Sequence, residues 1–148
     1  MNPLEIVKAA VAAAEPGHIS QLANLLTDDM VFTGPVPQPV GKREFVALQT
    51  AMVAAMPDWN FNARDYKESG NTVTATFKIS GTHTGELELP MPGFPKIPAT
   101  GKHVSLPLEG MTFTVRDGKI SRIESAAVPG GGVPGILAQL GISMPPMP

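Results

Sequence analysis

The chain has 148 residues, 43% of them hydrophobic and 16% charged, which is typical of one globular domain with a sizeable core and excludes a disordered chain. Its formal net charge is −2 and its Lys and Arg residues are scattered, which excludes a basic surface for nucleic acid, and the absence of cysteine excludes disulfides, thiolate metal ligands and cysteine nucleophiles. Because no stretch approaches the roughly 20 apolar residues of a membrane span and the amino terminus has no signal-peptide pattern, we expect a soluble, cytoplasmic protein without membrane contacts.

Three helices are predicted in the first half of the chain. The first begins after Asn2, a favourable N-cap residue, and its apolar residues recur at three- and four-residue spacing. A shorter helix is expected within residues 19–26. The third begins at Gly41 and ends at Met56, because the following Pro57 cannot continue the helical hydrogen bonds. Its apolar stripe is typical of a helix that lies on a sheet.

The rest of the chain is predicted to be mainly β-strand. Asp28 and Asp29 are expected to end the second helix or to form a turn. From position 58 onward apolar and polar residues alternate, as in antiparallel strands with one buried face. The predicted strands cover residues 30–32, 59–63, 72–79, 104–115 and 119–128. Since the early helices are the elements available to cover such a sheet, we predict an α+β fold.

Short motifs along the chain carry a resemblance to a known family. They are Asp28–Phe32, Pro57–Trp59, Gly81–Gly85, Pro98–Lys102, Asp117–Ile120 and Gln139–Gly141. In type and order they resemble the SnoaL-like polyketide cyclases of the nuclear transport factor 2-like superfamily. The resemblance implies a cystatin-like α+β barrel, cone-shaped, in which a strongly curved and mainly antiparallel sheet is closed by three helices of the N-terminal half. It also implies one SnoaL-like domain over residues 1–141, followed by a Met/Pro-rich tail at 142–148.

The resemblance further implies a pocket for a hydrophobic small molecule and a homodimer. In the polyketide cyclases an aspartate near the end of the last strand is the acid and base of an intramolecular aldol closure. The corresponding position here falls near Val128 or Gly132, and neither residue is acidic. This departure favours an alternative function, a non-catalytic ligand-binding or accessory protein.

Two polar residues share the parity of apolar strand positions. His83 continues the alternation of the strand before it, where it can either shuttle a proton or fix the strand end through hydrogen bonds. Glu109 shares parity with Met111 and Phe113, which predicts a carboxyl group in the core. Burial without a partner raises the pKa of a carboxyl group and suits it to acid or base chemistry. A bulge near Pro107 would instead turn Glu109 to solvent.

Two hypotheses follow. The first is a cofactor-independent enzyme with cyclase- or isomerase-like chemistry on a hydrophobic carbonyl compound, with Glu109 as the base and His83 as its polar partner. The second is the same pocket without catalysis. In both, the residues expected to line the pocket are Phe32, Met56, Trp59, Met111 and Phe113. The histidines at 18, 83 and 103 lack metal-ligand spacing, so neither a metal nor a cofactor is expected.

Overall fold

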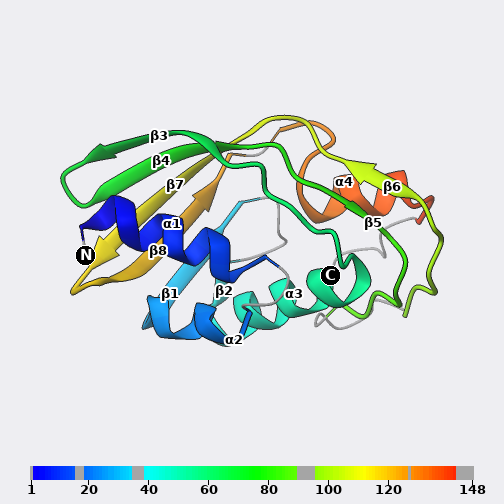
Figure 1. Ribbon diagram of the computed structural model, residues 1–148, viewed down its shortest axis with the longest axis horizontal. Helices are drawn as coiled ribbons and strands as arrows, with labels where there is room; N and C mark the ends of the chain where they lie inside the picture. The colour runs from blue at the N-terminus through cyan, green and yellow to red at the C-terminus, as the bar shows by residue number, and fades with distance from the viewer. Residues whose placement is uncertain (1, 16–18, 35–38, 90–95, 127, 143–148) are drawn as a thin grey trace.

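The computed structural model describes residues 2–15, 19–34, 39–89, 96–126 and 128–142, with the backbone alone for residues 132–134. Within these ranges a sheet of six strands, in the order β2-β1-β8-β7-β4-β3, curves around helices that lie on its concave face (Figure 1). The helical elements are α1 (Pro3–Ala13), α2 (Ile19–Leu22), the 3₁₀ turn η1 (Ala23–Leu25), α3 (Lys42–Ala55) and α4 (Gly132–Gln139). The strands are β1 (Leu26–Thr33), β2 (Val40–Gly41), β3 (Arg64–Ser69), β4 (Thr72–Phe77), β5 (Ser80–Thr82), β6 (His103–Ser105), β7 (Glu109–Arg116) and β8 (Lys119–Ser125).

The helix signals in the sequence are confirmed. The side chain of Asn2 caps α1 by accepting a hydrogen bond from the backbone N–H of Glu5 at 2.8 Å. α3 begins after Gly41 and ends at Ala55, just before Pro57. None of the helices in the described part of the chain is both long and apolar enough to cross a bilayer.

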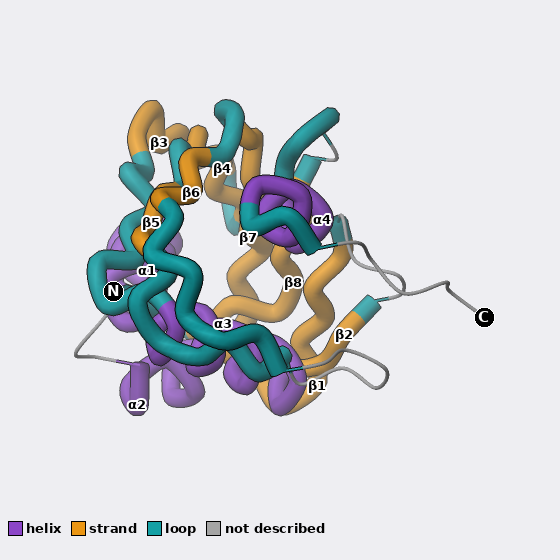
Figure 2. The backbone as a smooth tube through the Cα atoms, turned by 90° about the vertical axis from the view of Figure 1, so that its right-hand side faces the viewer, coloured by secondary structure: helices purple, strands orange, loops and turns teal. Residues whose placement is uncertain are grey.

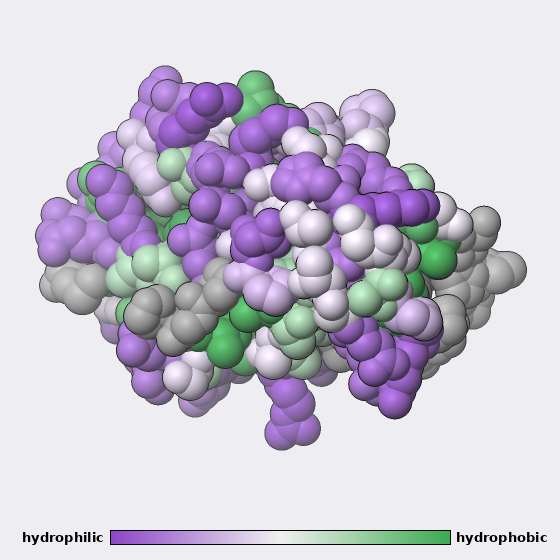
Figure 3. Space-filling view, turned by 45° about the vertical axis from the view of Figure 1, so that its right-hand side comes forward, coloured by the Kyte–Doolittle hydropathy of each residue, from purple (hydrophilic) through white to green (hydrophobic). Residues whose placement is uncertain are grey.

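The fold is α+β, as predicted, and its large curved sheet is mixed. β1 runs parallel to β8, whereas β8, β7, β4 and β3 pair antiparallel in turn. The short strands β5 and β6 form a separate pair, and α4 lies beside them (Figures 1 and 2). On the face seen in Figure 3 polar residues predominate and apolar residues form small separate patches, so the apolar side chains gather in the interior.

The predicted strand at 104–115 is wrong in one respect, because it is two strands in different sheets. Pro107 has no N–H to donate and lies between β6 and β7. On either side of it, the N–H of Leu106 donates to the carbonyl of Ile79, and Leu108 is 50% exposed. The break separates a small sheet near the C-terminal end of α3 from the main sheet.

Two other local predictions are corrected. Asp28 and Asp29 lie within β1 as exposed strand residues, where Asp29 forms an ion pair with Arg116, the last residue of β7. Residues 59–63 form no strand: a single bridge joins Asn60 to Ser80, and the backbone turns at Asn62, where φ is 46°. The alternation at 59–63 still has meaning, because Trp59 and Phe61 are buried and their neighbours Asn60 and Asn62 are exposed.

The segment Gly81–Gly85 is attached to the C-terminal end of α3. The carbonyl of Ala55 accepts hydrogen bonds from the backbone N–H groups of Thr84, at 3.2 Å, and of Gly85, at 2.9 Å. These bonds satisfy a carbonyl that the end of a helix leaves without an intrahelical partner. Gly85 lies so close that a Cβ atom there would be 2.5 Å from the carbonyl oxygen of Ala54. The glycine is therefore required by the close approach of two backbones.

Asp58 makes a second attachment between the same two segments. Its carboxylate accepts hydrogen bonds from the backbone N–H of Thr82, at 2.6 Å, and from the hydroxyl of Thr82, at 2.7 Å. These bonds lower the pKa of Asp58. Gly81 lies against Met56 and Trp59, where a Cβ atom would be 3.1 Å from the indole ring. The residue after Asp58 is Trp59, so this attachment also fixes the position of the tryptophan.

We expect Gly85→Ala to lower the free energy of unfolding by about 1–3 kcal/mol, because the new methyl group must separate the segment from α3. Denaturant unfolding followed by circular dichroism measures the change. Gly110→Ala is the matched control, since the nearest atom to its Cβ is the Cβ of Ala126 at 4.0 Å. Equal stabilities of the two variants would contradict the close packing described here.

Candidate functional site

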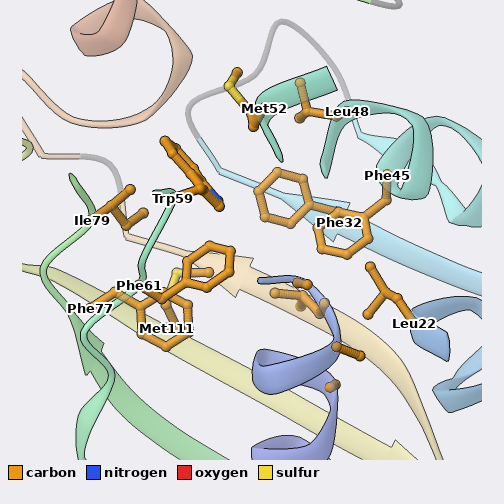
Figure 4. Packing of buried hydrophobic residues seen from close by; sticks show 14 of the residues in the cluster. Leu22, Phe32, Phe45, Leu48, Met52, Trp59, Phe61, Phe77, Ile79 and Met111 are labelled. Carbon is orange, nitrogen blue, oxygen red and sulfur yellow. The ribbon is translucent and has the colours of Figure 1, made fainter. Parts of the chain in front are cut away.

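A partly open cavity of about 100 Å³ lies between the helices and the concave face of the sheet. Its wall is almost entirely apolar, and Figure 4 shows several of the side chains around it. Half of the residues on this wall come from α1, α3, β4 and β7, with Phe32 from β1 and two residues from β8. The aromatic residues on the wall are Phe32, Phe45, Trp59, Phe61, Phe77 and Phe113.

The aromatic rings pack on one another around this space. Phe32 and Phe45 lie with ring centroids 5.1 Å apart, which joins β1 to α3. Trp59 meets the ring of Phe61 edge to face at 5.8 Å, and Phe61 lies 5.3 Å from Phe77. These separations are those of favourable aromatic pairs. The contacts give the cavity a firm wall of flat apolar surfaces.

Glu109 lies on this wall, as its parity predicts. It is the first residue of β7, it is 2% exposed, and its backbone lies opposite Phe77 of β4. The nearby Pro107 does not turn Glu109 outward, because the interruption between β6 and β7 ends before the first residue of β7. The carboxyl group lies against Gly131, the N-cap residue of α4, where an added Cβ would overlap its Oε1 atom. The cavity thus has a carboxyl group in a wall that is otherwise nearly all apolar.

His83 is also buried, but it does not line the cavity with Glu109. Its Nδ1 atom is 2.9 Å from the hydroxyl of Thr100 and accepts a hydrogen bond from the Thr100 backbone N–H at 3.3 Å. This is the arrangement of a histidine that fixes a strand end. Burial lowers the pKa of His83, and the nearby carbonyls of Ile97 and Gly85 oppose that shift.

The cavity wall as described therefore includes Glu109 but not His83, and the role of His83 as the polar partner of Glu109 stays a prediction. Met56 also lies away from the cavity wall, because the backbone leaves the helical conformation at this residue and its side chain packs on Gly81. Met52, one turn earlier on α3, occupies the wall instead. The remaining residues expected to line the pocket do so: Phe32, Trp59, Met111 and Phe113.

Sequence reasoning missed Gln49, a polar residue of the cavity wall. It follows Phe45 by four residues and precedes Met52 by three, so helical spacing places it on the apolar stripe of α3. The Oε1 atom of Gln49 is buried and has no hydrogen-bond partner among the described residues. The same is true of the Nε1 atom of Trp59. The wall therefore contains two polar atoms, one from Gln49 on α3 and one from Trp59 shortly after α3, that form no hydrogen bond with the described residues.

The described residues do not suggest a metal centre. Within the ranges that the structure covers, no three His, Asp or Glu side chains gather as a metal site requires. The polar side chains on the cavity wall are Gln49, Glu109 and Ser125, together with the indole nitrogen of Trp59. They can donate or accept hydrogen bonds, and Glu109 can also take up or release a proton.

The family model described as a SnoaL-like domain matches residues 7–123 of the sequence. No curated protein shows significant similarity to the chain. Among solved structures, the fold is similar to that of IdmH from Streptomyces antibioticus, a candidate polyketide cyclase, with a TM-score of 0.69 and 21% identity over 96% of this chain and 100% of that one.

Two further structures share the fold. A candidate SnoaL-like polyketide cyclase from Jannaschia sp. CCS1 has a TM-score of 0.68 and 18% identity, over 97% of this chain and 93% of that one. A protein from Catenulispora acidiphila with a ketosteroid isomerase-like fold, in complex with trimethylamine, has a TM-score of 0.65 and 16% identity, over 97% and 96%. At these identities the likeness shows the fold alone.

We expect the stability of the protein to fall in mild acid because of His83. Its pKa is lowered in the folded state, so the unfolded chain binds a proton more readily. The free energy of unfolding should therefore decrease as the pH falls from about 6.5 to the folded-state pKa, by at most about 1.4 kcal/mol per pH unit. Above pH of about 6.5 the contribution of His83 to stability should be fully present. Urea unfolding between pH 5 and 8, taken in roughly half-unit steps, measures the slope.

His83→Gln should remove this part of the pH dependence, since it removes the titrating group. His103→Gln is the control, because His103 is an exposed histidine of the adjacent strand β6. If the wild type and His83→Gln lose stability equally over the window, another group is responsible.

The contact between Glu109 and Gly131 predicts a coupled pair of substitutions. Gly131→Ala should lower the free energy of unfolding by about 1–3 kcal/mol, because its Cβ overlaps the Glu109 carboxyl group. In a Glu109→Ala background the cost should be smaller, with the contact of the Cβ to Val128 remaining. Costs that simply add in the double variant would show that the carboxyl group lies elsewhere.

Proposed function

Because the chain belongs to the SnoaL-like domain family, we propose that its cavity binds a small, largely apolar carbonyl compound and that Glu109 exchanges a proton with it in a cyclase- or isomerase-like reaction without a cofactor. One observation carries the proposal: Glu109 is 2% exposed on the wall of a nearly apolar cavity. The structural likeness to candidate polyketide cyclases supports the class of reaction.

The position of Glu109 in the sheet also supports this role. The resemblance implies an acidic residue near the end of the last strand, where this chain has Val128 and Gly132. β7 runs antiparallel to β8, so the start of β7 lies beside the end of β8. The N–H of Ala126 donates to the carbonyl of Gly110 at 2.9 Å, directly after Glu109. The adjacent strand thus provides a carboxyl group next to the position where the family has one.

In the proposed reaction the Glu109 carboxylate removes a proton from the carbon next to the carbonyl group. The C–H bonding electrons form an enolate, and the proton stays on Glu109. In an isomerisation the acid returns this proton to another carbon of the same conjugated system. In a ring closure the enolate carbon attacks a second carbonyl, and Glu109 protonates the resulting alkoxide. Each route regenerates the carboxylate.

The alternative function is ligand binding without chemistry. The lack of an acidic residue at Val128 and Gly132 favours it, and the same cavity would hold the ligand. The homodimer implied by the resemblance stays a prediction in both cases.

Proton exchange distinguishes the two functions without a known substrate. We expect the protein to catalyse exchange of the α-protons of a one-ring ketone such as cyclohexanone with D₂O, followed by NMR. Glu109→Gln should slow this exchange by about 10²–10⁴-fold, because the amide cannot accept the proton. Ketone binding, measured by quenching of Trp59, the only tryptophan, should change little.

Glu124→Gln is the matched control, since it replaces an exposed glutamate on the neighbouring strand β8. Exchange at the wild-type rate in Glu109→Gln would rule out Glu109 as the base. Binding of the ketone with no exchange above buffer would support the ligand-binding function instead.

A further inference from the structure

We propose that Trp59 and Gln49 form a polar recognition pair that selects a neutral, one-ring ligand with an oxygen that accepts a hydrogen bond and a group that donates one. The inference rests on the cavity of the proposed function and names its ligand class. It does not depend on the proton transfer by Glu109.

Trp59 provides the donor. Its side chain is 5% exposed on the cavity wall, and its Nε1 atom is buried without a hydrogen-bond partner among the described residues. An indole N–H can only donate, so its natural partner is an oxygen of a bound molecule. The neighbouring Asp58 is attached to Thr82 by two hydrogen bonds, which holds the tryptophan in place. A donor held in this way can select for an acceptor at one position.

Gln49 provides the second polar group, from the cavity face of α3. Its Oε1 atom is buried without a described partner, and it lies in a wall formed by Phe45, Leu48 and Met52 of the same helix. An apolar side chain at this position would pack against these residues without leaving a polar atom unpaired. A hydroxyl or N–H group of a ligand would satisfy the amide oxygen.

The size of the cavity limits the ligand to about one ring. Its volume is about 100 Å³. This is less than the roughly 150 Å³ of an apolar cavity that binds benzene, so a single ring is the largest ligand that this volume suggests. The rings of Phe32, Phe61 and Trp59 surround part of this space and offer flat surfaces to a planar or nearly planar molecule (Figure 4).

The donor on Trp59 also favours a neutral ligand over a cation. An ammonium group can donate to Gln49 or to the carboxyl group of Glu109, but it has no lone pair to accept from the indole N–H. A hydroxyl or carbonyl oxygen can accept that bond. If the oxygen belongs to a reacting carbonyl, the same N–H would stabilise the negative charge that develops on it as the enolate forms.

The test compares phenol with toluene, which have nearly the same shape but differ in the hydroxyl group. Binding of each to the full chain is followed by NMR titration, because one variant lacks tryptophan. We expect phenol to bind about five- to tenfold more tightly than toluene, although phenol is better hydrated in water. Trp59→Phe and Gln49→Met should each bring this ratio close to one. Met111→Leu, which changes the same wall without a polar atom, should leave it unchanged.

The same titrations in Glu109→Gln separate this inference from the proposed function. A phenol preference that persists in Glu109→Gln, or in a protein without proton exchange, supports the recognition pair even where the proposed chemistry fails. Equal or weaker binding of phenol overturns the inference, as does a cavity that holds only ordered water and neither probe. Tighter binding of trimethylammonium, lost in Glu109→Gln, would overturn it in favour of a cation site.

Discussion

The hydrogen bonds to the carbonyl of Ala55 are the constraint on which the interior depends. They join the end of α3 to the backbone of Thr84 and Gly85, two segments about 30 positions apart in the chain. α3 carries Phe45 and Gln49 to the cavity, and the chain that leaves it carries Trp59. A shift at this joint would move all three side chains together, because they belong to one continuous segment. The positions of these side chains on the cavity wall therefore depend on this attachment.

The sequence predicts periodic features well and breaks in periodicity poorly. Helical spacing places α1 and α3, and strand parity correctly places Glu109 in the core. Parity also predicts that His83 is buried, but not that it directly follows β5, a strand of the small sheet. Among the described residues, the chain leaves the main sheet after Phe77 and rejoins it at Glu109, so two buried residues of the same parity face different surroundings. Only the pairing of distant strands decides this.

Gln49 illustrates a different kind of information that the sequence does contain. A polar residue within an apolar helical stripe conflicts with the local pattern, and such conflicts concentrate at functional sites. The apolar stripe of α3 contains Phe45, Leu48 and Met52, and the polar Gln49 among them is easily overlooked. Trp59 is overlooked for a similar reason, because its apolar ring suits the core and only its Nε1 atom is a polar group there. Both residues stand out because each has a buried polar atom for which the described residues provide no hydrogen-bond partner.

The proposed role of Glu109 places the carboxyl group on a different strand from the one that the resemblance implies. Acid–base catalysis requires a carboxylate within reach of the reacting carbon, whichever strand provides it. In this chain the positions beyond β8, Val128 and Gly132, are not acidic, yet the adjoining start of β7 places Glu109 on the cavity wall. A carboxyl group at the start of β7 also has a structural requirement, since it needs the space that a side chain at position 131 would fill. Gly131, in the glycine-rich segment before α4, leaves that space open, so the segment without a titratable group still shapes the site.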